Sequence, residues 1–195
     1  MTRLAIFASG NGTNAENIIR HFHASPIAEV VSVFTNNPRA GVLERAARHS
    51  AKTHVFSRKD FFDSNRVLTI LIEEKIDFIV LAGFLWMVPA TLIRHFEKRI
   101  INIHPALLPD FGGKGFYGDK VHQAVIDSGT PISGITIHHV NEQFDEGEII
   151  FQAACHVDKT DTSSSLAAKI HELEQRYFAV VLEKLISGML TWETQ

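Results

Sequence analysis

Two polar side chains, Asn102 and His104, stand at the end of an apolar run, in the stretch Asn102-Ile103-His104-Pro105. Because side chains alternate along a strand, positions 102 and 104 point to the same side and can converge on one ligand atom. Acyl transfer to an amine requires a hydrogen-bond donor for the tetrahedral oxyanion and a group that exchanges protons near neutral pH. An amide and an imidazole meet these two requirements, so both residues are candidates for catalysis.

A third candidate, Asp145, lies in the stretch Phe144-Asp145-Glu146-Gly147. A turn at the end of a sheet could bring its carboxylate to His104, where it would hold the imidazolium and position water or a proton. Asp and Gly are also ordinary turn residues, and a histidine at a strand end often only satisfies a local carbonyl. On spacing alone, a structural role for these residues stays open beside the catalytic one.

A glycine turn follows the first apolar run, and residues 10–15 match the pattern G-x-G-x-x-A of dinucleotide-binding sites. Such a site usually has an acidic residue after the second strand, and here that place is Thr35-Asn36-Asn37. What remains is a nest of backbone N–H groups at a helix N-terminus, which suits a phosphate monoester. Gly12, Thr13 and Asn14 are therefore the phosphate candidates, and a glycine required only by a sharp turn is the alternative.

Other reactive side chains give weaker signals. His104, His138, His139 and Cys155 show no metal-ligand spacing, and the adjacent His138 and His139 would face opposite sides of a strand. No G-x-S-x-G elbow is present, and Cys155 lies within an apolar strand, where thiols are typically inert. We therefore expect neither a metal site nor serine or cysteine catalysis.

The elements that must position these residues alternate between strands and helices. We expect strands over residues 3–8, 29–34, 53–56, 77–82 and 99–103, and helices over 14–22, 42–49 and 89–95. A further helix carries an apolar stripe of Leu68, Leu71 and Ile72. Repeated β-α units predict an α/β, doubly wound, mostly parallel sheet whose ligands bind at the carboxyl ends of the strands.

The second half of the chain departs from this alternation. Residues 105–118 hold too many Pro and Gly residues for regular structure and predict a long functional loop. After a helix near 121–127, strands over 135–140 and 148–157 are expected to extend the sheet in antiparallel fashion. A last helix, capped within Ser163 to Ser165, should run to about residue 185 and end at Ser187-Gly188.

The composition bounds the class of protein. A chain of 195 residues with 45% hydrophobic and 21% charged residues indicates one globular domain, spanning residues 1–195. A net charge of -3 provides no basic surface for nucleic acid. No apolar run approaches the roughly 20 residues that cross a membrane, and one cysteine without a signal pattern indicates the cytoplasm. We expect small-molecule substrates, with the oligomeric state open between monomer and homodimer.

Four motifs together resemble the folate-dependent formyltransferases, and among them those that formylate glycinamide ribonucleotide. The motifs are residues 9–14, 81–84, 102–109 and 144–147. The Asn-x-His segment with Leu-Leu-Pro is shared across that family, whereas the Ser-Gly-Asn-Gly-Thr-Asn turn is particular to the glycinamide ribonucleotide enzymes. The likeness covers essentially the whole chain and implies a Rossmann-like formyltransferase fold. Relatives acting on transfer RNA, or hydrolysing formyltetrahydrofolate, carry a further domain that 195 residues do not hold.

The resemblance implies formyl transfer from the co-substrate 10-formyltetrahydrofolate to the amine of 5'-phosphoribosylglycinamide in de novo purine biosynthesis, with no metal required. It implies that His104 is the general acid/base, that Asn102 stabilises the oxyanion, and that Asp145 keeps the imidazole in its useful protonation state. Glu174 matches a ribose-binding glutamate and Arg58 a folate-contacting arginine. The pterin would be read largely by backbone groups along Leu85, Trp86, Met87, Val88, Asn141, Glu142, Gln143 and Phe144.

Two segments differ from the family pattern. Trp86 stands where arginine is common, and residues 112–118 replace a shorter Pro-Gly-x-His segment. A pterin read by the backbone tolerates the exchange at Trp86, and the glycine-rich segment suggests a lid with Lys114 near the anionic substrate. A nucleotide-binding module without activity would keep the glycine turn, but it need not keep Asn102, His104 and Asp145.

Overall fold

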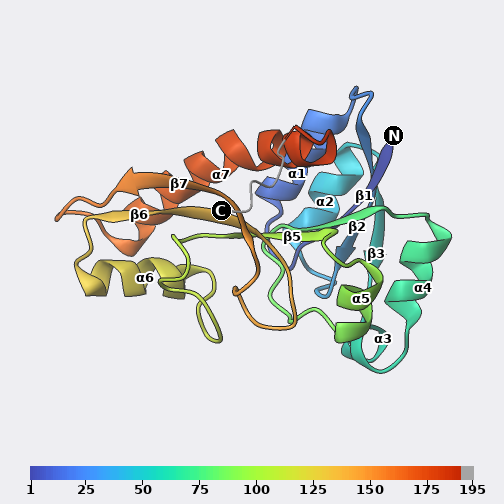
Figure 1. Cartoon of the computed structure of the whole chain (residues 1–195), viewed down its shortest axis with the longest axis horizontal. Helices are drawn as coiled ribbons and strands as arrows, with labels where there is room; N and C mark the ends of the chain where they lie inside the picture. The colour runs from blue at the N-terminus through green and yellow to red at the C-terminus, as the bar shows by residue number, and fades with distance from the viewer. Residues whose placement is uncertain (190–195) are drawn as a thin grey trace. The chain divides into compact units, whose positions relative to one another are not determined.

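The computed structural model describes residues 1–189, which divide into two compact units. The first unit comprises Met1–Phe84 together with the described residues from Tyr177 onward, and the second comprises Leu85–Arg176. Along the first 104 residues, one or two helices separate successive strands, and the colours of Figure 1 follow this order. Within the described residues, no helix has both the length and the apolarity of a membrane span.

The first unit is built on four parallel strands in the order β3-β2-β1-β4. Their bounds are β1 Thr2–Phe7, β2 Ala28–Thr35, β3 Lys52–Val55 and β4 Phe78–Leu81. The helices of this unit are α1 Thr13–Phe22, α2 Gly41–Arg48, α3 Arg58–Phe62 and α4 Arg66–Glu73. Each of these strands is followed along the chain by a helix, and ligands of such sheets bind at the carboxyl ends of the strands.

Aromatic rings pack beneath the carboxyl ends of β1 and β2. The ring of Phe7 stacks on that of Phe34 at a centroid separation of 4.8 Å and meets Phe84 edge to face at 5.4 Å. Each residue from Leu4 to Phe7 is buried, because a parallel strand covered on both faces has no solvent side. This packing makes a rigid base for the turn that follows β1.

Helix α4 corrects one sequence prediction. Val67 and Leu71 are its buried residues, whereas Ile72 is 49% exposed. Residues four positions apart lie on one helix face, so the pair at 67 and 71 packs inward and the next position turns toward solvent. The predicted stripe was therefore wrong at Ile72. The short helix α3 was not predicted, although its Ser57–Asp60 capping box is a helix-start signature.

The second unit is built on antiparallel strands in the order β5-β6-β7. Its elements are α5 Ala90–His95, β5 Ile100–His104, α6 Asp119–Ser128, β6 Ile132–His139 and β7 Ile149–His156. The long helix α7, Ser163–Ile186, begins in this unit. Parallel strands early in the chain and antiparallel strands late in it confirm the predicted fold class, and the loop predicted over 105–118 is present.

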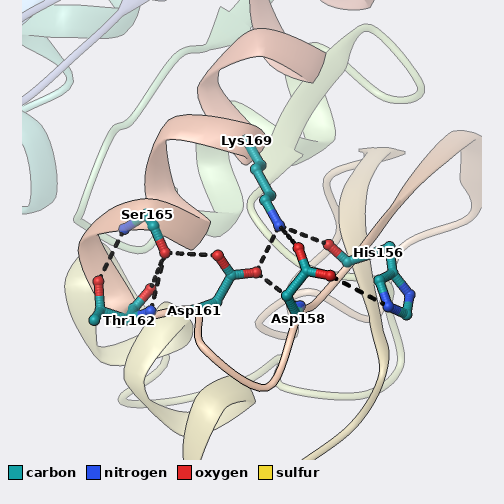
Figure 2. A network of polar contacts seen from close by, with 6 residues as sticks. All are labelled: His156, Asp158, Asp161, Thr162, Ser165 and Lys169. Carbon is teal, nitrogen blue, oxygen red and sulfur yellow. Dashed lines mark hydrogen bonds and ion pairs between the residues drawn. The ribbon is translucent and has the colours of Figure 1, made fainter.

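The start of α7 is fixed by a polar network shown in Figure 2. Thr162 and Ser165 exchange hydrogen bonds, each side-chain oxygen accepting from the other's backbone N–H, so Thr162 caps the helix just before the predicted Ser163. The Lys169 ammonium lies 2.7 Å from a carboxylate oxygen of Asp158 and 2.6 Å from one of Asp161. These ion pairs hold the first turns of α7 against the turn that leaves β7.

Candidate active site

His104 is the last residue of β5, and its side chain is buried within the second unit, with 3% of the residue exposed. Its Nε2 lies 2.8 Å from the backbone carbonyl oxygen of Phe111. Because a carbonyl only accepts, Nε2–H is the donor. The other ring nitrogen, Nδ1, faces Asp145 Oδ2 at 3.6 Å. The two ring nitrogens therefore have different partners, a fixed carbonyl and a carboxylate.

Asp145 is brought to His104 by the turn between β6 and β7, and its backbone is left-handed, with φ of 56°. Gly147 allows this approach, since a Cβ there would lie 1.7 Å from the carbonyl oxygen of His139. The carboxylate oxygen that faces His104 also accepts a hydrogen bond from the backbone N–H of Gly113 at 3.0 Å. The prediction that a turn brings the Asp145 carboxylate to His104 is met by this geometry.

Asn102 is paired across the sheet with His138 of β6. Its Nδ2 donates to His138 Nε2 at 3.1 Å, while His138 Nδ1 donates to the carbonyl of His139 at 2.8 Å. The same Nε2 lies 3.6 Å from Asp145 Oδ1. His138 thus stands between the amide and the carboxylate. Sequence reasoning weighed His138 only as a metal ligand and missed this position, which depends on the strand register.

Burial and neighbouring charges set the protonation states of His104 and Asp145. Burial lowers the pKa of His104 below its ordinary value, although the Asp145 carboxylate and the Phe111 carbonyl oppose this shift. Burial alone would raise the pKa of Asp145, but the nearby imidazole of His138, the charge of His104 and the hydrogen bond from the Gly113 N–H together hold it below its usual range. At neutral pH the site therefore holds an ionised carboxylate beside a neutral imidazole that can accept a proton.

A cavity of about 460 Å³ opens beside Asp145. That volume is in the range of small-molecule sites. One wall comes from the loop after β5 and the other from the turn between β6 and β7. The lining residues are Leu108, Pro109, Gly112, Gly113, Phe144, Asp145, Glu146, Gly147 and Ile149.

The loop after His104 is held by buried hydrogen bonds to the sheet. The Thr136 hydroxyl donates to the carbonyl of Ala106 at 2.7 Å and accepts from the Leu108 N–H at 2.9 Å. Gln152 of β7 donates to the carbonyl of Leu108 at 3.0 Å and to the Thr136 hydroxyl at 2.9 Å. Positions 106–108 are thereby fixed, and with them Leu108, which lines the cavity.

The predicted phosphate turn lies in the first unit and begins α1. Gly12 has φ of 78°, and a Cβ on it would lie 2.5 Å from Val42, so the position requires glycine on two counts. No side-chain hydrogen bond caps the helix at Gly12, and a helix N-terminus of this kind favours an anion. Arg45 of α2 braces the turn, since its Nε donates to the carbonyl of Asn11 at 2.9 Å and its guanidinium pairs with Glu16. Sequence reasoning missed Arg45.

The other residues predicted to contact the substrates lie on helices, at the glycine turn and in the loop after β5. Arg58 begins α3 in the first unit, with its guanidinium 4.7 Å from the centre of the Phe62 ring. Glu174 lies on α7 and is buried, as is Asn14 at the glycine turn. Lys114 is exposed.

The segments predicted to read the pterin both belong to the second unit. Leu85, Met87 and Phe144 are exposed large apolar residues, whereas Val88 is buried. Trp86 and Asn141 are half-buried, and Glu142 and Gln143 are exposed. An ion pair at 3.9 Å between Arg94 of α5 and Glu142 links the helix after the first segment to the second.

Metal-ligating side chains do not gather in the part of the chain that the structure describes: no group of three or more His, Cys, Asp or Glu residues there could hold an ion. Cys155 on β7 is half-buried, and burial raises the pKa of its thiol. A raised pKa disfavours the thiolate, the reactive form. The chemistry that these residues support is proton exchange and oxyanion stabilisation around His104.

Comparison with known proteins defines the class. A family model described as formyl transferase matches residues 2–182. A phosphoribosylglycinamide formyltransferase of Bacillus subtilis is 34% identical over 191 residues, 95% of each chain. A chloroplastic one of Arabidopsis thaliana is 38% identical over 196 residues, 97% of this chain and 67% of that protein. The crystal structure of the Bacillus halodurans enzyme has a TM-score of 0.86 at 38% identity, covering 100% of both chains. The chain therefore belongs to the formyl transferase family, in the group of the phosphoribosylglycinamide formyltransferases.

Proposed function

We propose that this chain transfers the formyl group of 10-formyltetrahydrofolate to the amine of 5'-phosphoribosylglycinamide, a step of de novo purine biosynthesis. The observation that carries the proposal is the buried His104, with Asp145 at 3.6 Å and the Asn102 amide at the same strand end. Membership of the family supports it.

The proposed reaction proceeds by direct attack of the amine nitrogen on the formyl carbon. A carbon–nitrogen bond forms, the formyl oxygen becomes an oxyanion, and the bond from carbon to N10 of the folate then breaks. The amine loses one proton and N10 gains one, so the products are the N-formyl ribonucleotide and tetrahydrofolate. His104 accepts and returns the proton, and one Nδ2 hydrogen of Asn102 binds the oxyanion while the other stays on His138.

The Asp145 carboxylate has two tasks in this proposal. It favours the imidazolium that His104 becomes during the reaction, since an opposite charge at 3.6 Å stabilises the charged form. It also opens directly onto the cavity of about 460 Å³, where the reacting groups would meet. The family's chemistry uses no metal. In this proposal His104 supplies the proton exchange and Asn102 the oxyanion binding without one.

We also propose which residues bind the two substrates. The N–H groups at the start of α1, with Gly12, Thr13 and Asn14, suit the phosphate of the ribonucleotide. Glu174 suits the ribose. Along residues 85–88 and 141–144, exposed apolar side chains and backbone groups suit the pterin, with Arg58 as a contact to the folate. We also propose that residues 1–195 act as one formyltransferase domain, located in the cytoplasm.

Purified protein should consume 10-formyltetrahydrofolate only when 5'-phosphoribosylglycinamide is present, and the rate should survive chelation of metal ions. Folate absorbance follows the reaction, and the N-formyl product is identified by mass. No turnover with this pair, or turnover only with water as acceptor, would contradict the proposal. Fractionation of the host cell, with the protein recovered in an organelle, would contradict the cytoplasmic location.

A further inference from the structure

The turn Phe111-Gly112-Gly113 contacts both His104 and Asp145, and it does so entirely through backbone groups. The Phe111 carbonyl accepts from His104 Nε2–H at 2.8 Å, and the Gly113 N–H donates to Asp145 Oδ2 at 3.0 Å. A carbonyl cannot donate, so Nε2 must carry a hydrogen whenever this bond exists. In the neutral ring the lone pair then lies on Nδ1, the nitrogen that faces Asp145.

The backbone of this turn has positive φ at Phe111 and Gly113, and Gly112 between them leaves no room for a side chain. Phe111 is left-handed, with φ of 54°, and Gly113 has φ of 91°. A Cβ at Gly112 would lie 2.4 Å from Leu108 Cδ2 and 3.4 Å from Asp145 Cβ, so the turn packs directly against the residue that it orients. A left-handed non-glycine residue persists only where its surroundings over-determine it, and such residues concentrate at functional sites.

The groups that face His104 come from three other elements. Asp145 faces Nδ1 from the turn between β6 and β7. A charge on His138 of β6 lowers the pKa of His104, and a charge on His104 lowers the pKa of His122 of α6. None of these three side chains contacts Nε2 in the hydrogen bonds of the described residues. The Phe111 carbonyl is therefore the group that decides between the two neutral tautomers of His104.

We infer that the Phe111-Gly112-Gly113 turn is a positioning element that selects the Nε2–H tautomer of His104, so that Nδ1 is the nitrogen that exchanges protons. The role of Nδ1 in catalysis rests on the proposed formyl transfer. The position of the hydrogen on the His104 ring does not depend on that proposal. Gly113 acts through Asp145 and Phe111 through His104, so neither residue needs to touch the substrate. Nδ1 lies toward Asp145, which lines the cavity of about 460 Å³.

Imidazole nitrogen NMR of the protein without substrates tests the tautomer directly, with His104 assigned by comparison with His104→Gln. Above the pKa of His104, the wild-type protein should show a pyrrole-type signal at Nε2 and a pyridine-type signal at Nδ1. The opposite pattern would overturn the inference. Because no substrate is present, the result does not depend on the proposed function.

Gly113→Ala and Gly115→Ala form a matched pair. Both glycines have positive φ, 91° and 101°, and neither would bring a Cβ within 4 Å of another residue. Only the Gly113 N–H contacts Asp145. Gly113→Ala should therefore mix the two His104 tautomers, whereas Gly115→Ala should keep the wild-type nitrogen signals. Unchanged His104 signals in Gly113→Ala would overturn the role of the turn.

Kinetics separate this inference from the proposed function. Gly113→Ala should lower kcat by about 10-fold while leaving the KM for the ribonucleotide unchanged, since displacement of a catalytic group by a fraction of an ångström affects the chemical step. A higher KM with unchanged kcat would overturn the positioning role. A wild-type protein with the expected tautomer but no formyl transfer would refute the proposed function and leave the tautomer assignment intact.

Discussion

The amide nitrogen Nδ2 of Asn102 lies 3.1 Å from Nε2 of His138, its paired residue across β5 and β6. His138 in turn donates from Nδ1 to a backbone carbonyl, which leaves Nε2 of the neutral ring as an acceptor. The amide of Asn102 is thereby oriented with its nitrogen toward His138, and its second N–H remains for a ligand. An oxyanion donor oriented in advance stabilises the transition state at little cost in reorganisation.

His138→Ala should lower kcat by roughly 10-fold to 100-fold with little change in either KM, because the Asn102 amide loses the group that orients it. His139→Ala is the matched control, since His139 is the adjacent buried residue of the same strand and has no contact with Asn102 in the described hydrogen bonds. Steady-state kinetics and thermal unfolding should be measured on both. Equal losses of kcat in the two variants would indicate a structural role for His138.

Asn102→Asp and His104→Ala should each reduce kcat by roughly 100-fold or more. Asn102→Asp keeps the shape of the side chain but removes the N–H donors, and His104→Ala removes the proton acceptor. The affinity for ribonucleotide, measured by calorimetry, should stay nearly constant. A loss of affinity as large as the loss of kcat would show that these residues bind the substrate or support the fold instead.

The pH dependence of kcat should report His104. Only the neutral imidazole accepts a proton, so kcat should rise with pH through a pKa below the ordinary 6.5 and level off by neutral pH. Asp145→Asn removes the charge that opposes the effect of burial, so the pKa of His104 should fall further and the acid limb should move to lower pH. An acid limb that stays in place or moves to higher pH would contradict this assignment.

Gly12→Ala should destabilise the protein by about 1–3 kcal/mol, because it combines a left-handed φ of 78° with a Cβ placed 2.5 Å from Val42. Gly10→Ala is the control, since a Cβ there meets nothing within 4 Å. Urea unfolding measures both changes.

In the proposed phosphate site, Asn14→Ala should mainly raise the KM for the ribonucleotide, and an effect confined to folate would reassign the turn.

The ion pairs at the start of α7 should contribute stability that disappears in acid. Hydrogen bonds from Lys169 and Ser165 lower the pKa of Asp161 from 3.8 to about 2. A carboxylate with a lowered pKa stabilises the fold above its unfolded-state pKa, and the contribution is lost as pH falls from 3.8 toward 2. The difference in urea midpoint between wild type and Lys169→Met should therefore shrink in this range. Lys159→Met, in the same turn, should show no such change.

Much of the fold could be predicted from the sequence because hydrophobic periodicity follows the period of each element. The strands of the first half and the antiparallel pair β6 and β7 lie within two or three residues of their predicted ends. The error at Ile72 arose because an apolar run on a short helix leaves the inward face ambiguous by one position. Such ambiguity disappears only when the packing against the sheet is known.

The candidate site could be predicted only in part, and the missing parts have a common cause. Asn102 and His104 are polar residues at the end of an apolar strand, and Asp145 is an acidic residue in a turn, so their side chains give a signal in the sequence. The Phe111 carbonyl and the Gly113 N–H give none, because every residue carries the same backbone groups. His138 was missed because its pairing with Asn102 depends on register, which a single sequence does not reveal.

The transfer of an isotopically labelled formyl group tests the central claim most directly. Metal-free wild-type protein, supplied with labelled 10-formyltetrahydrofolate and 5'-phosphoribosylglycinamide, should place one label on the amine of the ribonucleotide for each tetrahydrofolate formed. His104→Ala, run at the same protein concentration, should do so at a rate lower by roughly 100-fold or more. Label recovered as free formate, or a His104→Ala rate equal to that of the wild type, would contradict the account.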